Sequence, residues 1–231
     1  MESNTGTNAI PHNETVINRF TKQAKEFFHK SHNSNQYGLN LMLKLSNPGK
    51  EDTVLDVACG PGIIACEYAK LVNHVTGIDL TPSLIERAKH VQKEQGLNNI
   101  EWRVGDVSNL PFSDESFSIV MTRASFHHIV DRKRVLEEMI RVCKIGGKIL
   151  VVEVTPDNDK KEAFNHVEKL REPSYTNAWT LEELTKTMKD LGAVNIGSER
   201  FDLEMDLEKN LTSLVPNLKT KTKLSTFQTR S

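Results

Sequence analysis

The sequence lacks a membrane-spanning run, a secretory signal and a cysteine motif for metal binding. None of its 231 residues falls in a run of about 18 apolar residues, which excludes a membrane-spanning helix. Residues 1–13 are polar and lack the apolar core of a secretory signal. The three cysteines, Cys59, Cys66 and Cys143, contain no CxxC pair. We therefore expect a cytoplasmic protein with free thiols, no disulfide framework and no metal site.

An excess of charge of one sign is also missing. Lys and Arg total 30, Asp and Glu total 31, and the formal net charge is −1. This balance provides no global basic field, so we expect no nucleic-acid partner. Residues 217–231 are the local exception, with Lys219, Lys221, Lys223, Arg230 and no acid. Such a run is usually solvated, although it also suits an anionic partner.

Apolar residues make up only 37% of the chain, but they follow regular patterns. Residues 14–46 predict two helices, which Asn47-Pro48-Gly49 ends. Short apolar strands then alternate with helices. The expected strands are 53–58, 74–79, 100–104, 117–122, 148–154 and 194–201. The expected helices are 63–71, 81–96, 131–143 and 180–192, with a short charged helix at 159–170 inside an otherwise irregular stretch, 156–178.

This alternation predicts an α/β fold with a doubly wound, mostly parallel sheet covered on both faces. We expect one domain over 14–202, in which 14–46 forms a helical lid or cap. Polar tails of residues 1–13 and 203–231 would flank it. Ligands of such sheets bind outside the carboxyl ends of the strands, so the residues just after each strand are the candidates for a site.

Acidic residues lie at the carboxyl ends of three consecutive strands. Asp56 precedes the glycine loop that contains Gly60 and Gly62, while Asp79 and Asp106 end the next two strands. Glycines permit close approach of the backbone to a ligand, and a helix N-terminus binds anions. A carboxylate about 20 residues beyond the glycines can accept hydrogen bonds from both ribose hydroxyls. The pattern indicates a site for a nucleoside that carries an anion.

Two cofactors fit this description. Gly60-x-Gly62-x-x-Ala65 satisfies the dinucleotide pattern G-x-G-x-x-G/A, although this match alone is weak. Asp56 would crowd a pyrophosphate, whereas it suits the cationic amino group of a methionine moiety. Asp106 is also suited to accept a hydrogen bond from an adenine amino group. An aminoacyl nucleoside therefore explains more of these residues than a dinucleotide does.

These blocks resemble the class I S-adenosylmethionine-dependent methyltransferases, in particular the branch around the ubiquinone/menaquinone biosynthesis C-methyltransferases. The likeness covers about residues 14–200, and the matching blocks are residues 54–62, 75–82, 104–112 and 145–150. Ala58 stands where many members have the first glycine of the loop. The resemblance implies a Rossmann-like methyltransferase fold whose seventh strand is antiparallel. Only residues 224–229, with poor alternation, are available for that strand, which leaves it doubtful.

The resemblance also implies roles for residues at matching positions. S-adenosylmethionine would be the cofactor. Asp79 would hold its ribose, Leu80 would pack on its adenine, and Asp106 and Val107 would contact the adenine edge. The glycine loop, together with Asp56, would line the methionine end. The implied cofactor-binding residues are Asp56, Ala58, Gly60, Gly62, Asp79, Leu80, Asp106, Val107 and Arg123.

The substrate side is less defined, and no catalytic residue follows from the sequence. Phe20 lies on the first helix, which either closes over the site or packs on the edge of the sheet. His127 and His128 follow the fourth strand, where one could act as a base or both could be structural. Tyr175 lies in the irregular stretch 156–178, the other candidate cover of the substrate pocket.

The function that fits best is methyl transfer to a small-molecule acceptor by in-line displacement. A cofactor-binding module without turnover is the first alternative. A nicotinamide-dependent oxidoreductase is the second, although no further catalytic domain follows. The sequence leaves open the acceptor, the type of atom methylated and the oligomeric state.

Overall fold

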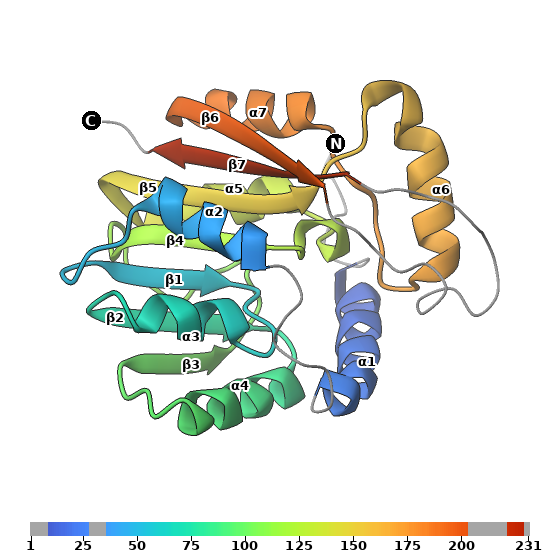
Figure 1. Cartoon of the computed structure of the whole chain (residues 1–231). Helices are drawn as coiled ribbons and strands as arrows, with labels where there is room; N and C mark the ends of the chain where they lie inside the picture. Colours follow the sequence, from blue (N-terminus) through green and yellow to red (C-terminus); the bar gives the residue numbers. More distant parts are fainter. Residues whose placement is uncertain (1–8, 28–35, 203–220, 229–231) are drawn as a thin grey trace.

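The computed structural model describes residues 9–27, 36–202 and 221–228. Seven strands form one sheet in the order β3-β2-β1-β4-β5-β7-β6 (Figure 1). The strands are β1 Thr53–Val57, β2 His74–Asp79, β3 Ile100–Val104, β4 Phe117–Arg123, β5 Cys143–Val154, β6 Val194–Asp202 and β7 Lys221–Gln228. The α-helices are α1 Ala9–Phe27, α2 Gln36–Ser46, α3 Ile63–Ala69, α4 Pro82–Glu94, α5 Arg132–Val142, α6 Lys161–Arg171 and α7 Leu181–Asp190.

Strands β1 to β5 pair in parallel, as the alternating pattern predicted. Most residues of β1, β2, β4 and β5 are buried on both sides of the pleat, because both faces of the sheet are covered, whereas the edge strand β3 exposes Glu101 and Arg103. One face packs against α5 and α7 through a cluster that includes Leu55, Val120 and Met139. The other packs against α2, α3 and α4 and includes Val54 and Tyr68. The doubly wound α/β fold is therefore confirmed (Figure 1).

The last strand, which the sequence left doubtful, is present. β7 lies between β5 and β6 and is antiparallel to both. Thr226, for example, pairs with Leu150 on one side and with Gly197 on the other. Part of the segment expected to be a polar tail thus completes the sheet. Polar strand residues are tolerated here because backbone hydrogen bonds on both sides hold the strand.

Several boundaries differ from the expected ones. Helix α1 begins at Ala9 rather than at residue 14, so part of the expected N-terminal tail is helical. Strand β5 begins at Cys143 rather than at residue 148. The short charged helix expected at 159–170 is present as α6, which begins at Lys161 and ends at Arg171. At the start of α7, Thr180 and Glu183 form a capping box.

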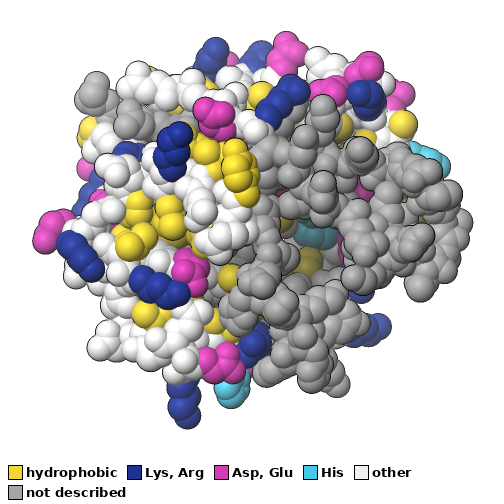
Figure 2. All heavy atoms as spheres, in the orientation of Figure 1, with side chains coloured by type: hydrophobic (Ala, Val, Ile, Leu, Met, Phe, Trp, Pro, Cys, Tyr) yellow, Lys and Arg dark blue, Asp and Glu magenta, His cyan; other side chains and the backbone are white. Residues whose placement is uncertain are grey.

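Helices α1 and α6 lie beyond the carboxyl ends of the parallel strands (Figure 1). On the face shown in Figure 2, basic and acidic side chains are interspersed over the described surface. None of the described helices combines the length and the apolarity needed to cross a bilayer. Of the expected tails, residues 1–8, 203–220 and 229–231 lie outside the described residues.

Candidate cofactor and acceptor site

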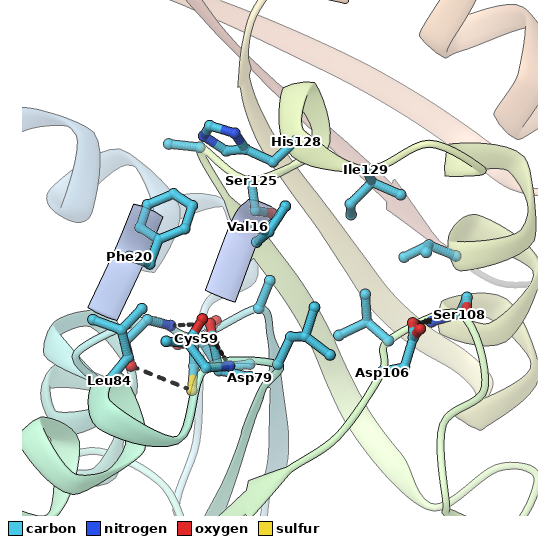
Figure 3. A pocket seen from close by; sticks show the side chains of 18 of the residues that line it. Val16, Phe20, Cys59, Asp79, Leu84, Asp106, Ser108, Ser125, His128 and Ile129 are labelled. Atoms are coloured by element: carbon cyan, nitrogen blue, oxygen red, sulfur yellow. Dashed lines mark hydrogen bonds between the residues drawn. The ribbon is translucent and has the colours of Figure 1, made fainter. Parts of the chain in front are cut away.

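A large pocket lies at the carboxyl ends of the strands, beneath α1. Its volume is about 1000 Å³. Residues that follow β1, β2, β3 and β4 form its floor and walls, and Asn13, Val16 and Phe20 of α1 cover it. In Figure 3, Phe20, Val16, His128 and Ile129 lie on one side, opposite Cys59, Asp79 and Asp106. The pocket thus has an apolar side next to α1 and a polar side along the strand ends.

Of the predicted site residues, the pocket brings together ten that are far apart in sequence. They are Phe20, Asp56, Ala58, Gly60, Asp79, Leu80, Asp106, Val107, Arg123 and His128. Gly62, His127 and Tyr175 do not line it. Convergence of the post-strand residues follows from the parallel sheet, since the carboxyl ends of all five parallel strands meet at one edge.

The loop after β1 has an unusual backbone. Ala58 and Gly60 both have positive φ angles, +57° and +54°. A Cβ on Gly60 would meet nothing within 4 Å, so the loop backbone there is open to a ligand. At Gly62, close packing rather than an open backbone requires glycine. A Cβ there would lie 2.4 Å from Trp102 and 2.7 Å from Ala88, so Gly62 allows α3 and α4 to pack closely.

Asp79 connects the loops that follow β1 and β2. Its carboxylate accepts hydrogen bonds from the backbone N–H of Gly60 at 2.9 Å and of Thr81 at 2.8 Å. Burial raises the pKa of Asp79, and the two backbone hydrogen bonds oppose this shift. Each carboxylate oxygen retains acceptor capacity after one hydrogen bond. Asp79 is therefore fixed in position and can still accept hydrogen bonds from a ligand.

Asp56 lies deeper and is only 3% exposed. Burial and, to a smaller extent, the neighbouring Asp79 raise the pKa of its carboxyl to about 8, against the opposing effect of Arg123. Its Oδ2 atom is buried and has no hydrogen-bond partner. A buried polar atom without a partner is costly to the folded protein, and a ligand that supplies a hydrogen-bond donor removes that cost. The floor of the pocket thus provides a site for a cationic donor.

Asp106 holds the loop after β3. Its Oδ1 accepts from the backbone N–H of Ser108 at 2.9 Å and from the Ser108 hydroxyl at 2.7 Å. Its Oδ2 accepts from the Asn13 side-chain amide of α1 at 2.9 Å. Sequence reasoning missed Asn13, because nothing local indicates a contact between residues 93 positions apart.

Helix α1 covers the pocket, the first of the two interpretations that the sequence left open. In addition to the contact of Asn13, His12 Nε2 bonds the backbone carbonyl of His128 at 2.7 Å. Ser83 of α4 donates to Thr21 at 3.2 Å. Arg19 Nε donates to both oxygens of Glu172, each at 2.9 Å. These contacts attach α1 to four different segments around the pocket rim.

The two adjacent histidines have different surroundings. His127 points away from the pocket, and its Nδ1 lies 2.7 Å from the buried Glu153 carboxylate. Burial opposes protonation of His127, but Glu153 outweighs this effect and raises its pKa. His128 lines the pocket, with its ring edge toward Phe20 at a centroid distance of 5.0 Å. Burial, together with the neighbouring His127, lowers the pKa of His128 to about 4.

Tyr175 is a structural residue on the far side of His127. Its ring lies 5.7 Å from the His127 ring, and its hydroxyl bonds the side chain of Asn165. It is 6% exposed and does not line the pocket. In the parts of the chain that the structure describes, no three His, Cys, Asp or Glu side chains are grouped to hold a metal ion.

Comparison with known proteins places the chain in a family. Residues 55–151 match the family model "Methyltransferase domain". The uncharacterised methyltransferase YcgJ of Bacillus subtilis is 31% identical over 166 residues, which are 71% of this chain and 66% of YcgJ. A demethylmenaquinone methyltransferase of Thermotoga maritima is 38% identical over 117 residues, 50% of this chain and 48% of that protein. The chain thus spans about half to about two thirds of these curated relatives.

A solved structure agrees over a longer range. The crystal structure of YcgJ superposes with a TM-score of 0.72 at 25% identity, covering 84% of this chain and 99% of that one. The chain therefore belongs to the class I S-adenosylmethionine-dependent methyltransferases. Within this class it is related to the branch of the demethylmenaquinone methyltransferases, and S-adenosylmethionine is its cofactor. The unpartnered Asp56 Oδ2 fits this cofactor, whose amino group is a cationic donor.

Proposed function

We propose that the protein transfers a methyl group from S-adenosylmethionine to a small-molecule acceptor. The observation that carries the proposal is the buried Asp56 carboxylate at the pocket floor, with one oxygen that has no partner. It supplies the acceptor that an ammonium group needs. A dinucleotide would bring a pyrophosphate to the same loop but no cationic group to pair with Asp56, and the ionised form of Asp56 would repel it. The pocket therefore favours an aminoacyl nucleoside over the nicotinamide cofactor of the alternative hypothesis.

The other pocket residues suit the remaining parts of the cofactor. Asp79 would accept from the ribose hydroxyls, since it is buried and held by two backbone N–H groups. Leu80 would pack on adenine, while Asp106 and Val107 would contact its edge. The open backbone at Gly60 and the neighbouring Ala58 would face the methionine end, and Arg123 would partly balance the charge of Asp56 there. Gly62 would act indirectly, through the packing of the loop against Trp102.

When bound, S-adenosylmethionine supplies an electrophilic methyl group on a positively charged sulfur. The protein's contribution is then mainly to align the acceptor with that methyl group and to exclude water. Alignment of this kind can contribute roughly 7–11 kcal/mol to lowering the barrier. The contacts of α1 with the pocket rim serve both tasks, because they close the apolar side of the pocket.

The position of α1 supports a small acceptor. Val16 and Phe20 cover the pocket where His128 and Ile129 line it, so an acceptor between them would be surrounded by side chains (Figure 3). A macromolecular acceptor would need that side to be open. We further propose that residues 14–202, with β7 added, form one methyltransferase domain.

Calorimetric titration tests the proposal directly. S-adenosylmethionine and its demethylated product should bind the wild type, and NADH should not. Asp56→Asn should weaken cofactor binding about 10- to 100-fold, because a charge-assisted hydrogen bond is worth roughly 1.5–3 kcal/mol. Asp159→Asn, an exposed carboxylate outside the pocket, is the matched control and should bind like the wild type. Absence of S-adenosylmethionine binding, or tight NADH binding, would overturn the proposal.

Turnover is tested separately. Labelled methyl transfer to a panel of small hydroxyl, amine and activated-carbon compounds distinguishes an enzyme from a binding module. Transfer to any acceptor supports the enzyme. Tight cofactor binding without transfer to any compound, including those in a cell extract, supports the module.

A further inference from the structure

We propose that Ser174 and Glu172 hold His128 with its proton on Nδ1, so that Nε2 accepts the proton which the acceptor loses during methyl transfer. The proposal rests on the proposed function and adds a class of acceptor. In such an acceptor, the methylated atom is the oxygen of a hydroxyl or the nitrogen of an amine, or it is a carbon conjugated with one of these groups. Arg19, Glu172 and Ser174 are positioning residues in this arrangement, since they act through His128.

The assignment of the proton follows from counting hydrogens along a buried chain of contacts. Ser174, which is fully buried, donates its hydroxyl hydrogen to Glu172 Oε1 at 2.9 Å. The same hydroxyl oxygen lies 3.0 Å from His128 Nδ1. A hydroxyl has one hydrogen, and here Glu172 takes it. The Ser174 oxygen is therefore an acceptor toward His128, and Nδ1 must carry the hydrogen.

A second acceptor points to the same tautomer. The backbone carbonyl of Ser174 lies 3.2 Å from His128 Nδ1, and a carbonyl can only accept. Glu172 is ionised, because the hydrogen bond from Arg19 and that from Ser174 together outweigh the effect of burial and lower its pKa. An ionised carboxylate has no hydrogen to give to Ser174, so the direction of the chain cannot reverse.

The other ring nitrogen of His128, Nε2, belongs to a side chain that lines the pocket. Both acceptors of Ser174 lie at Nδ1, and no partner for Nε2 is found among the described residues. The ring forms part of the pocket lining and contacts Phe20 edge to face. The lowered pKa of His128, about 4, keeps the ring neutral at physiological pH. A neutral imidazole with Nδ1–H has a lone pair on Nε2.

Three ionisable side chains act on the charge of His128: His127, Glu153 and Glu172. His127 is adjacent, with ring centroids 4.2 Å apart, and its positive form disfavours a second charge on His128. Glu153 and Glu172 act in the opposite direction. From α1, His12 Nε2 bonds only the backbone carbonyl of His128. These groups give a base that is neutral at rest, with two carboxylates near enough to stabilise a transient positive charge.

The proton balance defines the acceptor. As the acceptor atom forms its bond to the methyl carbon, the electron pair of the methyl–sulfur bond stays on sulfur. The methylated acceptor is left with a positive charge and a highly acidic O–H or N–H, and this proton passes to His128 Nε2. A weak base suffices, because the donor becomes acidic only as the new bond forms. An acceptor without such a hydrogen gains nothing from His128.

Helix α1 connects this arrangement to the cover of the pocket. Arg19 reaches Glu172 from α1, and the next residue, Phe20, contacts the His128 ring. The same helix therefore covers the acceptor side and supports the carboxylate that receives the Ser174 hydrogen. Positioning of the base and covering of the pocket depend on one element.

Long-range ¹H–¹⁵N correlation spectra of the histidine side chains test the proposal without an acceptor. In the wild type at pH 7, His128 should show the neutral Nδ1–H tautomer. Ser174→Ala removes the hydroxyl acceptor at Nδ1 and keeps the backbone carbonyl, so it should raise the fraction of the Nε2–H tautomer of His128 without making it complete. The signals of His127 should stay unchanged, because His127 bonds Glu153. Ser198→Ala, an exposed serine of β6, is the matched control and should leave both histidines unchanged.

A wild-type His128 that is an Nε2–H tautomer, or is positively charged at pH 7, would overturn the proposal. So would a Ser174→Ala variant with an unchanged His128 spectrum. If Ser174→Ala does not fold, the wild-type spectrum still decides the tautomer, and Arg19→Gln on the partly exposed α1 provides a second variant. Calorimetric binding of S-adenosylmethionine is measured on the same samples. Normal binding with the wrong tautomer rejects this inference alone, whereas absent binding rejects the proposed function.

Discussion

Arg19 and Glu172 lie 153 positions apart, and their side chains form an ion pair at the rim of the pocket. Arg19 Nε donates to both carboxylate oxygens, each at 2.9 Å. Glu172 is almost buried, whereas the Arg19 side chain is 34% exposed. This pair connects α1 to the segment after α6, and through Ser174 to His128. It is thus a contact of the pocket cover rather than of the core.

Removal of this pair should loosen α1 without unfolding the sheet. Arg19→Ala should lower the local stability of α1 by about 1 kcal/mol, a value reduced for the exposure of Arg19. Amide hydrogen exchange in residues 9–27 should then accelerate about fivefold, while exchange in β1 and β4 stays unchanged. Lys22→Ala, an exposed residue of α1, is the control. Equal exchange rates in Arg19→Ala and wild type would show that the pair does not hold the helix.

The buried Asp56 should make the free protein less stable as pH rises. Its folded pKa, about 8, lies above the ordinary value of 3.8. The unfolded chain therefore loses the proton first, so the stability that Asp56 contributes is present below pH 4 and is lost as pH rises toward 8. Asp56→Asn should remove this dependence and stabilise the free protein at pH 7 by on the order of 2–4 kcal/mol. Urea unfolding of both proteins from pH 4 to 8 checks the sign. A constant difference between them would contradict it.

The same carboxyl predicts proton release on cofactor binding. An ammonium group favours the ionised form of Asp56, so binding at pH 7 should release close to one proton. Calorimetry in buffers of different ionisation enthalpy measures this number. The release should shrink above pH 8, where Asp56 is already ionised, and disappear in Asp56→Asn. A release that persists in the variant would assign the proton to another group.

Alanine substitutions at Gly62 and Gly96 distinguish the cost of overpacking from the cost of an unfavourable backbone conformation in the free energy of unfolding. Both have positive φ angles, +75° and +66°. A Cβ on Gly62 would collide with Trp102, whereas one on Gly96 would meet nothing within 4 Å. Gly96→Ala should cost about 1 kcal/mol from conformation alone, and Gly62→Ala about 2–4 kcal/mol because overpacking adds to it. Urea unfolding gives both values. Equal costs would mean that the loop moves away from Trp102 without penalty.

Much of the cofactor side could be predicted from the sequence because it depends on local signals. Asp56, Asp79 and Asp106 each lie at the carboxyl end of a short strand, and parallel strands bring these ends to one edge. The glycine loop is local too, although the role of Gly62 in packing required the position of Trp102. A regular alternation of strands and helices was sufficient to predict the sheet.

The acceptor side depends on contacts that no local pattern indicates. Ser174 bonds His128 across 46 positions, and Glu172 bonds Arg19 across 153. Both lie in a stretch that was expected to be irregular, where no periodicity shows which side chains turn inward. The sequence could name His128 as a candidate, but its difference from His127 depends on Glu153 of β5, whose carboxylate holds His127.

Strand β7 was the least predictable element and provides the last test. Polar and apolar residues alternate poorly along β7, and backbone pairing with β5 and β6, which no residue pattern indicates, fixes the strand. Proline at an interior position removes a donor and is tolerated only at edges. Thr226→Pro should therefore destabilise the protein by about 3 kcal/mol or more. Thr226→Ala, which keeps the N–H, should cost under about 1 kcal/mol. Thermal unfolding of the two variants compares them. Equal melting temperatures would show that β7 contributes little to the sheet in solution, and β5 would then carry an unpaired edge.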